Sequence, residues 1–403
     1  MKKNKIFSNR VMEDFKKESP SKINIKNNKD LNNYLNLHVN LFENLKFPTE
    51  LFKNKKIIDL GCGTGEVDLV INKFGGKLEC IDFQKKSIEY ANFIKKKKGL
   101  KNISFKNISI EDYKVKKNFF DISISFGVIN HVYDQEGLFK KLVNSTKKGG
   151  YIILGFVEDA GLIQRLLHRA IIRKLSENDE KKVYEYAKKL FSEHINRSVK
   201  FGMRTYRGII NDYLVNQAYD GLSTIKLNNW IKKYKLKYYS SLPKAELPIR
   251  IDSATKNFEL KNIHLKKNIE SLYRLRSIFA HSKDEKVYSH LAGIKNSNIS
   301  KNIENLITEI NKILQVKNNF ASNKNLKKLK NLKKKLNFDI SYLFKNIKKN
   351  TLNNFSNMSD EIINLLEVIN DKNCSYKLIK KKIKYLFKGY NGLGTSYYIL
   401  KKY

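Results

Sequence analysis

Hydrophobic and polar positions follow two alternating patterns between residues 55 and 156. Short apolar runs bounded by glycine or polar residues predict five buried strands, at residues 55–60, 77–83, 102–107, 119–127 and 151–156. Stretches with helical spacing lie between them, at residues 67–74, 87–100 and 134–150. Strands and helices that alternate at this spacing form parallel βαβ units. The pattern therefore predicts an α/β fold with a doubly wound, Rossmann-like sheet and a ligand site at the carboxyl ends of its strands.

Outside this region the pattern is mostly helical. Within a polar N-terminal segment, residues 31–45 have helical spacing that ends before Pro48. Residues 161–175 alternate apolar positions with arginines, and residues 227–243 predict a short helix followed by a strand. Apolar stripes at 303–314 and 326–347 have helical spacing and do not alternate with strands, so residues 250–390 are expected to be helical.

The last thirteen residues, 391–403, predict a turn and a β-strand. Because such a strand has no partner within a helical region, we expect it to return to the sheet and pair antiparallel with residues 237–242. The alternative is an unrelated two-stranded ribbon. The predicted organisation is an N-terminal helical segment (1–50), a ligand-binding domain (51–157), a helical region with a sixth strand (158–243), a helical insertion (244–390) and the C-terminal strand (391–403).

Composition and charge change this picture only in part. The chain has 80 Lys and Arg against 39 Asp and Glu, a net charge of +41 that is largest in the last third. Lys, Asn and Ile are over-used throughout, which indicates a compositional bias; attraction to a polyanion such as RNA is the alternative. Three widely spaced cysteines exclude a disulfide scaffold and a four-cysteine zinc site, and no metal site is expected. The absence of a long apolar run or a secretory leader favours a cytoplasmic protein.

The glycine-rich run from Ile57 to Val67 carries the strongest chemical signal. Gly61, Gly63 and Gly65 lie where a strand passes into a helix, and glycine there permits positive φ and close approach to a ligand. Glu66 stands where a dinucleotide fingerprint needs glycine, and the Lys-Ser/Thr of a P-loop is absent. Asp59 would repel a pyrophosphate and suits a ligand that carries an ammonium group.

Asp82 ends the second predicted strand. A carboxylate at this place can accept hydrogen bonds from both hydroxyls of a ribose. The alternative is a solvated turn residue.

Four segments resemble the class I S-adenosylmethionine-dependent methyltransferases in order and spacing: IIDLGCGTGE, IDFQKKSIEYA, FDISISFGVINHV and KKGGYIILG, across about residues 55–156. The resemblance implies a seven-stranded sheet with an antiparallel last strand and S-adenosylmethionine as the cofactor. It also implies that Asp59 and the turn formed by Gly61, Cys62, Gly63 and Gly65 line the methionine part, and that Asp82 holds the ribose. Phe83 and Ser125 would complete the site. The family usually has an aspartate toward the adenine after the third strand, whereas this chain has Ser109, whose hydroxyl can bond the adenine amine beside the backbone of Ile110.

The resemblance also places candidate catalytic and substrate residues. His131 follows the fourth strand, where acceptors meet the cofactor, and is a candidate general base; the alternative is a structural or pocket-lining role. Residues 161–243 resemble a subgroup with a helical lid over the active site. Residues there and beside His131 could contact an anionic or hydroxylated acceptor, or simply pack on the sheet: Asn130, Arg165, His168, Arg169, Tyr206, Arg207, Asp212 and Tyr213.

These features together predict methyl transfer to a small-molecule acceptor, such as a sugar, a glycan precursor or another metabolite, because a lid suits a covered pocket. The first alternative is an RNA methyltransferase whose basic C-terminal region holds phosphates. Against it, the segment after the fourth strand (Ser125, Phe126, Gly127, Val128) has neither the Pro-Pro motif of base-amino methylation nor a cysteine nucleophile. The second alternative is a non-catalytic adaptor.

Overall fold

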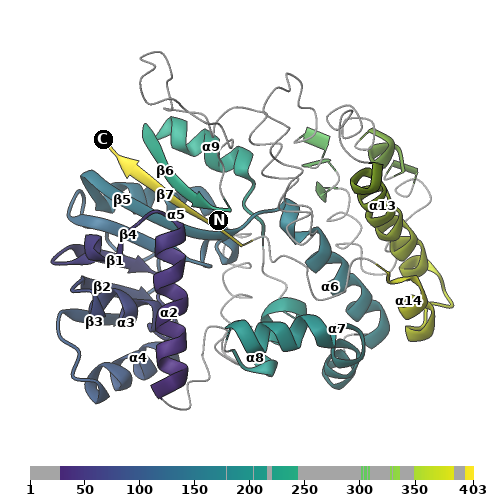
Figure 1. Ribbon diagram of the computed structural model, residues 1–403, viewed down its shortest axis with the longest axis horizontal. Coiled ribbons are helices and arrows are strands. Elements are labelled where there is room, and N and C mark those ends of the chain that lie inside the picture. Colours follow the sequence, from purple (N-terminus) through teal and green to yellow (C-terminus); the bar gives the residue numbers. More distant parts are fainter. Residues whose placement is uncertain are drawn as a thin grey trace.

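The computed structural model describes residues 28–177, 179–202, 204–215, 220–243, 349–384 and 395–403, with short stretches of 301–308 and 327–335 (Figure 1). The predicted N-terminal segment before residue 28 lies outside these residues. So do most of the two apolar stripes predicted at 303–314 and 326–347.

A seven-stranded sheet organises the molecule, in the order β3-β2-β1-β4-β5-β7-β6. The strands β1 to β5 are parallel to one another, whereas β7 is antiparallel to both β5 and β6. The strands are β1 (Lys56–Leu60), β2 (Lys77–Asp82), β3 (Ile103–Asn107), β4 (Phe120–Phe126), β5 (Thr146–Val157), β6 (Leu236–Leu242) and β7 (Thr395–Lys402). This sheet confirms the predicted α/β, Rossmann-like fold, and it has the seven strands and the antiparallel last strand that the resemblance implied.

Helices cover both faces of the sheet because successive strand residues point to opposite sides. Ile57 of β1 packs in a core with α2 (Asn28–Asn44), α3 (Glu66–Lys73) and α4 (Lys85–Lys97). Its neighbour Ile58 packs in a second core with α5 (Gln135–Ser145) and α9 (Thr224–Lys233). The 3₁₀ turn η1 (Thr49–Phe52) follows Pro48 and leads into β1.

One predicted boundary is wrong. The helix expected over residues 134–150 ends at Ser145, and residues 146–150 belong to β5. The Thr146 side chain hydrogen-bonds Ser123 of β4 (2.8 Å), and the β4–β5 register shifts between Phe120 and Ile122. Gly149 and Gly150, which suggested the end of a helix, therefore lie in the irregular first part of β5.

The C-terminal strand returns to the sheet as predicted, and the separate-ribbon alternative is excluded. β7 pairs along its whole length with β5, from Tyr151 opposite Lys401 to Val157 opposite Thr395. Tyr398, Ile399 and Leu400 are completely buried. Residues 243–394 are consequently an insertion between two neighbouring strands of one sheet.

The helices that follow β5 lie beyond the carboxyl ends of the parallel strands (Figure 1). They are η3 (Ala160–Leu162), α6 (Ile163–Ser176), α7 (Glu180–Gly202), α8 (Tyr206–Ile210) and the π-helical turn η4 (Asn211–Val215). We call residues 160–215 the lid helices. Two helices of the insertion, α13 (Lys349–Asn370) and α14 (Tyr376–Lys382), share one hydrophobic core with α6 and α7. The insertion helices α13 and α14 therefore pack against the lid helices.

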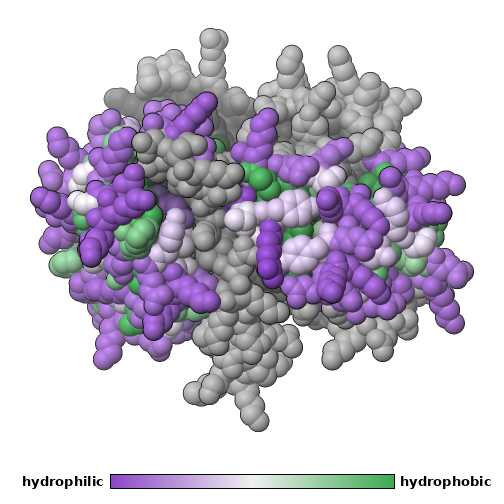
Figure 2. Space-filling model, turned by 90° about the horizontal axis from the view of Figure 1, so that it is seen from below, coloured by the Kyte–Doolittle hydropathy of each residue, from purple (hydrophilic) through white to green (hydrophobic). Residues whose placement is uncertain are grey.

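The surface is strongly polar. The face drawn in Figure 2 shows mostly hydrophilic side chains, with small apolar areas between them. Within the described ranges no helix is long and apolar enough to cross a membrane.

Candidate functional site

The turn between β1 and α3 requires its three glycines. Gly61, Gly63 and Gly65 have φ values of +91°, +57° and +79°, in the region that favours glycine. A Cβ on Gly61 would lie 2.3 Å from a methyl carbon of Val128, and one on Gly65 would lie 2.7 Å from the Phe105 ring. The turn is thus packed tightly against the segment after β4 and against β3.

Asp82 fixes this turn from the neighbouring strand. One carboxylate oxygen accepts a hydrogen bond from the backbone N–H of Gly63 (2.9 Å), and the other accepts one from Gln84 (2.8 Å). Burial raises the pKa of Asp82, and these two backbone donors oppose the increase. Because each carboxylate oxygen can accept a second hydrogen bond, Asp82 retains acceptors for two ligand hydroxyls.

Asp59 lies deeper than the turn, beside a second carboxyl group that the sequence analysis missed. Asp59 is 3% exposed and Asp68 of α3 is completely buried. Burial and the neighbouring Asp68 raise the pKa of Asp59 well above its usual range. Burial likewise raises the pKa of Asp68 to about 7, although the Cys80 thiol and Asp59 partly oppose this. Two carboxyl groups so placed share a proton rather than ionise together.

The other predicted cofactor residues differ in exposure. Cys62 and Phe83 are half-buried beside the glycine turn, and burial raises the pKa of the Cys62 thiol to about 12. Ser109 is half-buried, and its hydroxyl donates to the Asp112 carboxylate (2.7 Å). The carbonyl of the adjacent Ile110 accepts from the Lys141 ammonium.

Ser125 occupies a different environment. Its side chain is completely buried and donates to the Leu60 carbonyl of β1 (2.8 Å). This bond ties β4 to β1 directly below the glycine turn, so Ser125 supports the turn from within the sheet.

The short 3₁₀ turn η2 (Ile129–His131) follows β4 and ends with His131. Val128, which contacts Gly61, accepts a hydrogen bond from the His131 backbone N–H (2.8 Å). Asn130 is completely buried, and its side chain bonds both the backbone N–H and the carbonyl of Val157 and the carbonyl of Asp220. These bonds occupy the side-chain nitrogen and oxygen of Asn130, and they join η2 to the end of β5 and to the backbone at Asp220.

Glu158, which the sequence did not indicate as important, also holds the backbone next to the lid helices. This completely buried carboxylate accepts from the backbone N–H of Ala160 (2.7 Å) at the start of the lid helices and from that of Thr224 (3.3 Å) at the start of α9. No sequence pattern marks it, because a lone glutamate after a strand is ordinarily solvated.

Arg165 and Arg169 of α6 hold the η4 turn. Their guanidinium groups donate to the backbone carbonyls of Asp212 and Tyr213. Arg165 and Arg204 each lie 3.1 Å from a different carboxylate oxygen of Asp212. Arg165 also lies over the ring of Tyr213. These residues form one charged cluster that is largely shielded from solvent, in which Arg165 and Arg169 bond the η4 turn.

The remaining predicted substrate residues are placed apart. Arg207 is exposed and lies 3.8 Å from Glu180 on the outer side of the lid. Tyr206 is half-buried at the start of α8, and His168 is completely buried and stacks on Phe191.

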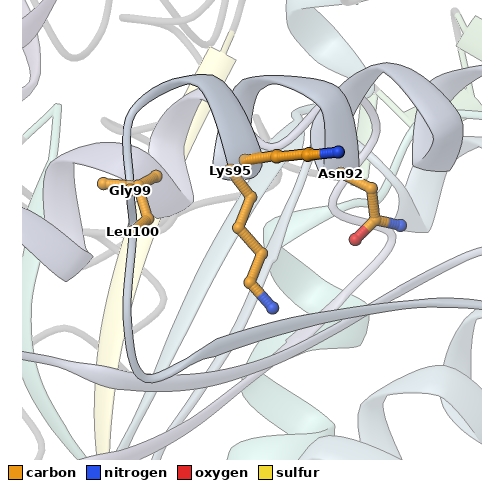
Figure 3. A pocket seen from close by; sticks show the side chains of 5 residues that line it. Asn92, Lys95, Gly99 and Leu100 are labelled. Atoms are coloured by element: carbon orange, nitrogen blue, oxygen red, sulfur yellow. The ribbon is translucent and has the colours of Figure 1, made fainter.

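A hollow on α4 is unrelated to this site. It encloses about 480 Å³ and is lined by Asn92, Lys95, Lys96, Gly99 and Leu100 (Figure 3). Because Gly99 and Leu100 lead into β3, the hollow lies toward the amino ends of the parallel strands, away from the glycine turn. No group of three His, Cys, Asp or Glu side chains suited to a metal ion occurs in the described part of the chain.

Known proteins match the same region. Residues 51–218 match a family described as a methyltransferase domain. Over 102 residues the chain is 36% identical to a ubiquinone biosynthesis O-methyltransferase of Pelagibacter ubique, covering 25% of this chain and 42% of that protein. It is 27% identical to a ribosomal RNA small subunit methyltransferase G of Bacteroides thetaiotaomicron, covering 43% of this chain and 85% of the other.

Solved structures also match the sheet region. An S-adenosylmethionine-dependent methyltransferase from Mesorhizobium loti has 18% identity and a TM-score of 0.26, over 28% of this chain and 51% of that one. This chain aligns with less than half the length of the Pelagibacter protein, at 42%, and with 48% of a putative methyltransferase of invertebrate iridescent virus 6.

Proposed function

Because residues 51–218 are a class I S-adenosylmethionine-dependent methyltransferase domain, we propose that this chain transfers a methyl group from S-adenosylmethionine to a small-molecule acceptor bound beneath the lid helices. The acceptor class is a sugar, a glycan precursor or another metabolite. The bound cofactor supplies a methyl group on a sulfonium, which is an electrophile that needs only a correctly placed acceptor.

The pairing of the glycine turn with Asp82 is the observation that carries this proposal. Asp82 holds the Gly63 backbone and keeps free acceptor capacity for ribose hydroxyls, so the residues present fit a nucleoside. The buried Asp59 carboxyl group, one of whose oxygens has no hydrogen-bond partner within the protein, suits a ligand that carries an ammonium group. The role of Ser109 and Ile110 toward the adenine is part of the same proposal.

The lid favours a small acceptor. Glu158 bonds the backbone at Ala160, where the lid helices begin, and Asn130 bonds the backbone at Asp220, beyond their end. Within the lid helices, Arg165 and Arg169 bond the backbone of the η4 turn. Because these hydrogen bonds hold the lid helices in place, we expect them to cover the acceptor site. An enzyme that acts on a long nucleic acid needs an open groove instead. His131 would accept the proton that a neutral oxygen or nitrogen acceptor loses.

RNA is the second candidate acceptor. The net charge of +41 favours attraction to phosphates, and one relative covered over 85% of its length is named as a ribosomal RNA methyltransferase. In this alternative the basic residues outside the sheet hold the RNA backbone.

The experiment is transfer of methyl label from S-adenosylmethionine into a host extract that is then separated into RNA, protein, lipid and small-molecule or glycan pools. Label in the small-molecule or glycan pool supports the proposal, and label in RNA supports the second candidate. A chain that incorporates no label and binds no S-adenosylhomocysteine in a calorimetric titration would contradict both and favour a non-catalytic adaptor.

A further inference from the structure

The side chain of Lys141 holds the turn that follows β3, residues 109–113, which we call the β3 turn. Lys141 lies on α5 and is half-buried. Its ammonium donates to the backbone carbonyls of Ile110 (2.5 Å), Glu111 (2.8 Å) and Tyr113 (3.1 Å). An ammonium has three N–H donors, so these bonds use all of them. One side chain therefore fixes three carbonyls of a segment that lies outside the helices and strands.

The β3 turn begins beside the Asp82 backbone. The Asp82 carbonyl accepts from the Ile108 backbone N–H (3.0 Å) and from the Asn107 side chain (3.1 Å). The Asn107 side chain also donates to the Phe83 carbonyl (2.9 Å). A nucleoside whose ribose is held by the Asp82 carboxylate would therefore have its base next to the β3 turn.

The β3 turn presents hydrogen-bonding groups of fixed polarity. The Ser109 hydroxyl donates to the Asp112 carboxylate (2.7 Å) and accepts from the Asp112 backbone N–H (3.1 Å), so one lone pair of its oxygen remains. The Ser109 carbonyl accepts from the Tyr113 N–H (3.0 Å) within the turn. Because the C=O and N–H of a planar trans peptide point in opposite directions, the Ile110 N–H points out of the turn. This N–H has no hydrogen-bond partner among the described residues, so the turn offers one acceptor and one donor.

We infer that the β3 turn selects adenine over a 6-oxo purine, and that Lys141 is the positioning residue of this turn. The inference rests on the proposed function, because it needs S-adenosylmethionine as the cofactor. Adenine has an amino group that donates and a ring nitrogen, N1, that accepts, and these match the Ser109 oxygen and the Ile110 N–H. In hypoxanthine both are reversed, since an oxygen replaces the amino group and N1 carries a hydrogen. Ser109 cannot donate to that oxygen because its proton is held by Asp112.

The test compares two ligands of the full chain by calorimetric titration: S-adenosylhomocysteine and S-inosylhomocysteine, in which hypoxanthine replaces adenine. We expect the wild type to bind the first at least about tenfold more tightly, the scale for a hydrogen-bonding group left without its partner. Lys141→Met keeps an unbranched apolar side chain and removes the ammonium. It should weaken S-adenosylhomocysteine binding by about tenfold and leave S-inosylhomocysteine binding nearly unchanged, so that the preference for adenine disappears.

Lys140→Met is the matched control. Lys140 is the exposed neighbour of Lys141 on the same helix, and its replacement should leave both affinities unchanged. An equal loss of affinity for both ligands in Lys141→Met would overturn the inference, because a general loss of structure does not distinguish the two bases. An unaltered preference for adenine in this variant would also overturn it.

Asp112→Ala tests the polarity of the turn independently, and it serves also if Lys141→Met does not fold. Asp112 is exposed, and without its carboxylate the Ser109 hydroxyl is free to donate to a ligand oxygen. S-inosylhomocysteine should then bind about tenfold more tightly than it binds the wild type. Unchanged binding of S-inosylhomocysteine to Asp112→Ala would overturn the inference.

Failure of the proposed function gives a different result. A wild-type chain that binds neither ligand lacks the nucleoside site on which the proposed function and this inference both rest. Methyl label found in RNA would overturn the small-molecule acceptor and leave the preference for adenine intact. Binding of S-adenosylhomocysteine without the expected effects of Lys141→Met and Asp112→Ala would overturn this inference alone.

Discussion

The buried pair formed by Asp59 and Asp68 makes the free energy of unfolding depend on pH in an unusual direction. Both carboxyl groups have pKa values raised in the folded chain, that of Asp68 to about 7. Between the unfolded value of 3.8 and about 7, the folded chain therefore binds more protons than the unfolded chain. Stability contributed by the protonated form is present at low pH and is lost as the pH rises through this window.

Asp68→Asn removes the part of this pH dependence that Asp68 contributes. The amide cannot ionise, and it can donate a hydrogen bond to Asp59. A pKa change from 3.8 to about 7 corresponds to roughly 4 kcal/mol, as an upper value because the pair shares its proton. At pH 8 the variant should be more stable than the wild type by a part of this amount. At pH 5, where Asp68 is already protonated, the difference should be small.

The assay is thermal unfolding of the full chain in matched buffers from pH 5 to pH 8.5. One kcal/mol shifts the Tm of a domain of this size by roughly 2–4 °C, so even a quarter of the effect is measurable. Asp121→Asn is the matched control. Burial raises the pKa of Asp121, but the Lys56 backbone and Lys147 lower it overall, so its loss should cost similar stability at pH 5 and pH 8. A difference between Asp68→Asn and wild type that is the same at both pH values would refute the reasoning.

Three further predictions concern the glycine turn and the sheet. Gly61→Ala places a Cβ 2.3 Å from Val128 at a φ of +91°, so it should lower the free energy of unfolding in urea by about 1–3 kcal/mol and weaken S-adenosylhomocysteine binding. The control is Gly99→Ala, at a φ of +59° with open space around it, which should leave binding unchanged. Equal effects of the two substitutions would contradict the packing argument. Asp82→Ala should weaken S-adenosylhomocysteine binding by about 1–3 kcal/mol in calorimetry, and unchanged affinity would remove Asp82 from the cofactor site. Deleting residues 395–403 exposes the β5 edge and should abolish cooperative thermal unfolding, whereas an unaltered melting curve would mean that β7 adds nothing to the sheet.

Much of the fold followed from local patterns. The five parallel strands were predictable because apolar runs and glycine-rich turns alternate with helices, and β7 because a strand-like segment after a helical region needs a partner. The start of β5 was missed because Gly149 and Gly150 suggest a helix end, while the bond of Thr146 to Ser123 depends on the neighbouring strand.

The site was less predictable than the fold. Gly61 and Asp82 carry signals in the sequence, because a positive φ and a strand-end carboxylate have few alternatives. Asp68 lies in an ordinary helical segment, and nothing local shows that α3 turns it toward Asp59. The cluster of Arg165 with Asp212 joins residues 47 positions apart, a relation that only tertiary packing creates.

The position of β7 has a consequence for how the protein is made. A ribosome completes β5 and β6 long before it reaches residue 395, yet these strands are not neighbours until β7 fills the space between them. During synthesis of residues 243–394, both strands expose unpaired edges, which are templates for association with other chains. The insertion therefore sets a delay during which the exposed strand edges of the nascent sheet must be shielded. The sheet is complete only after the ribosome has synthesised β7.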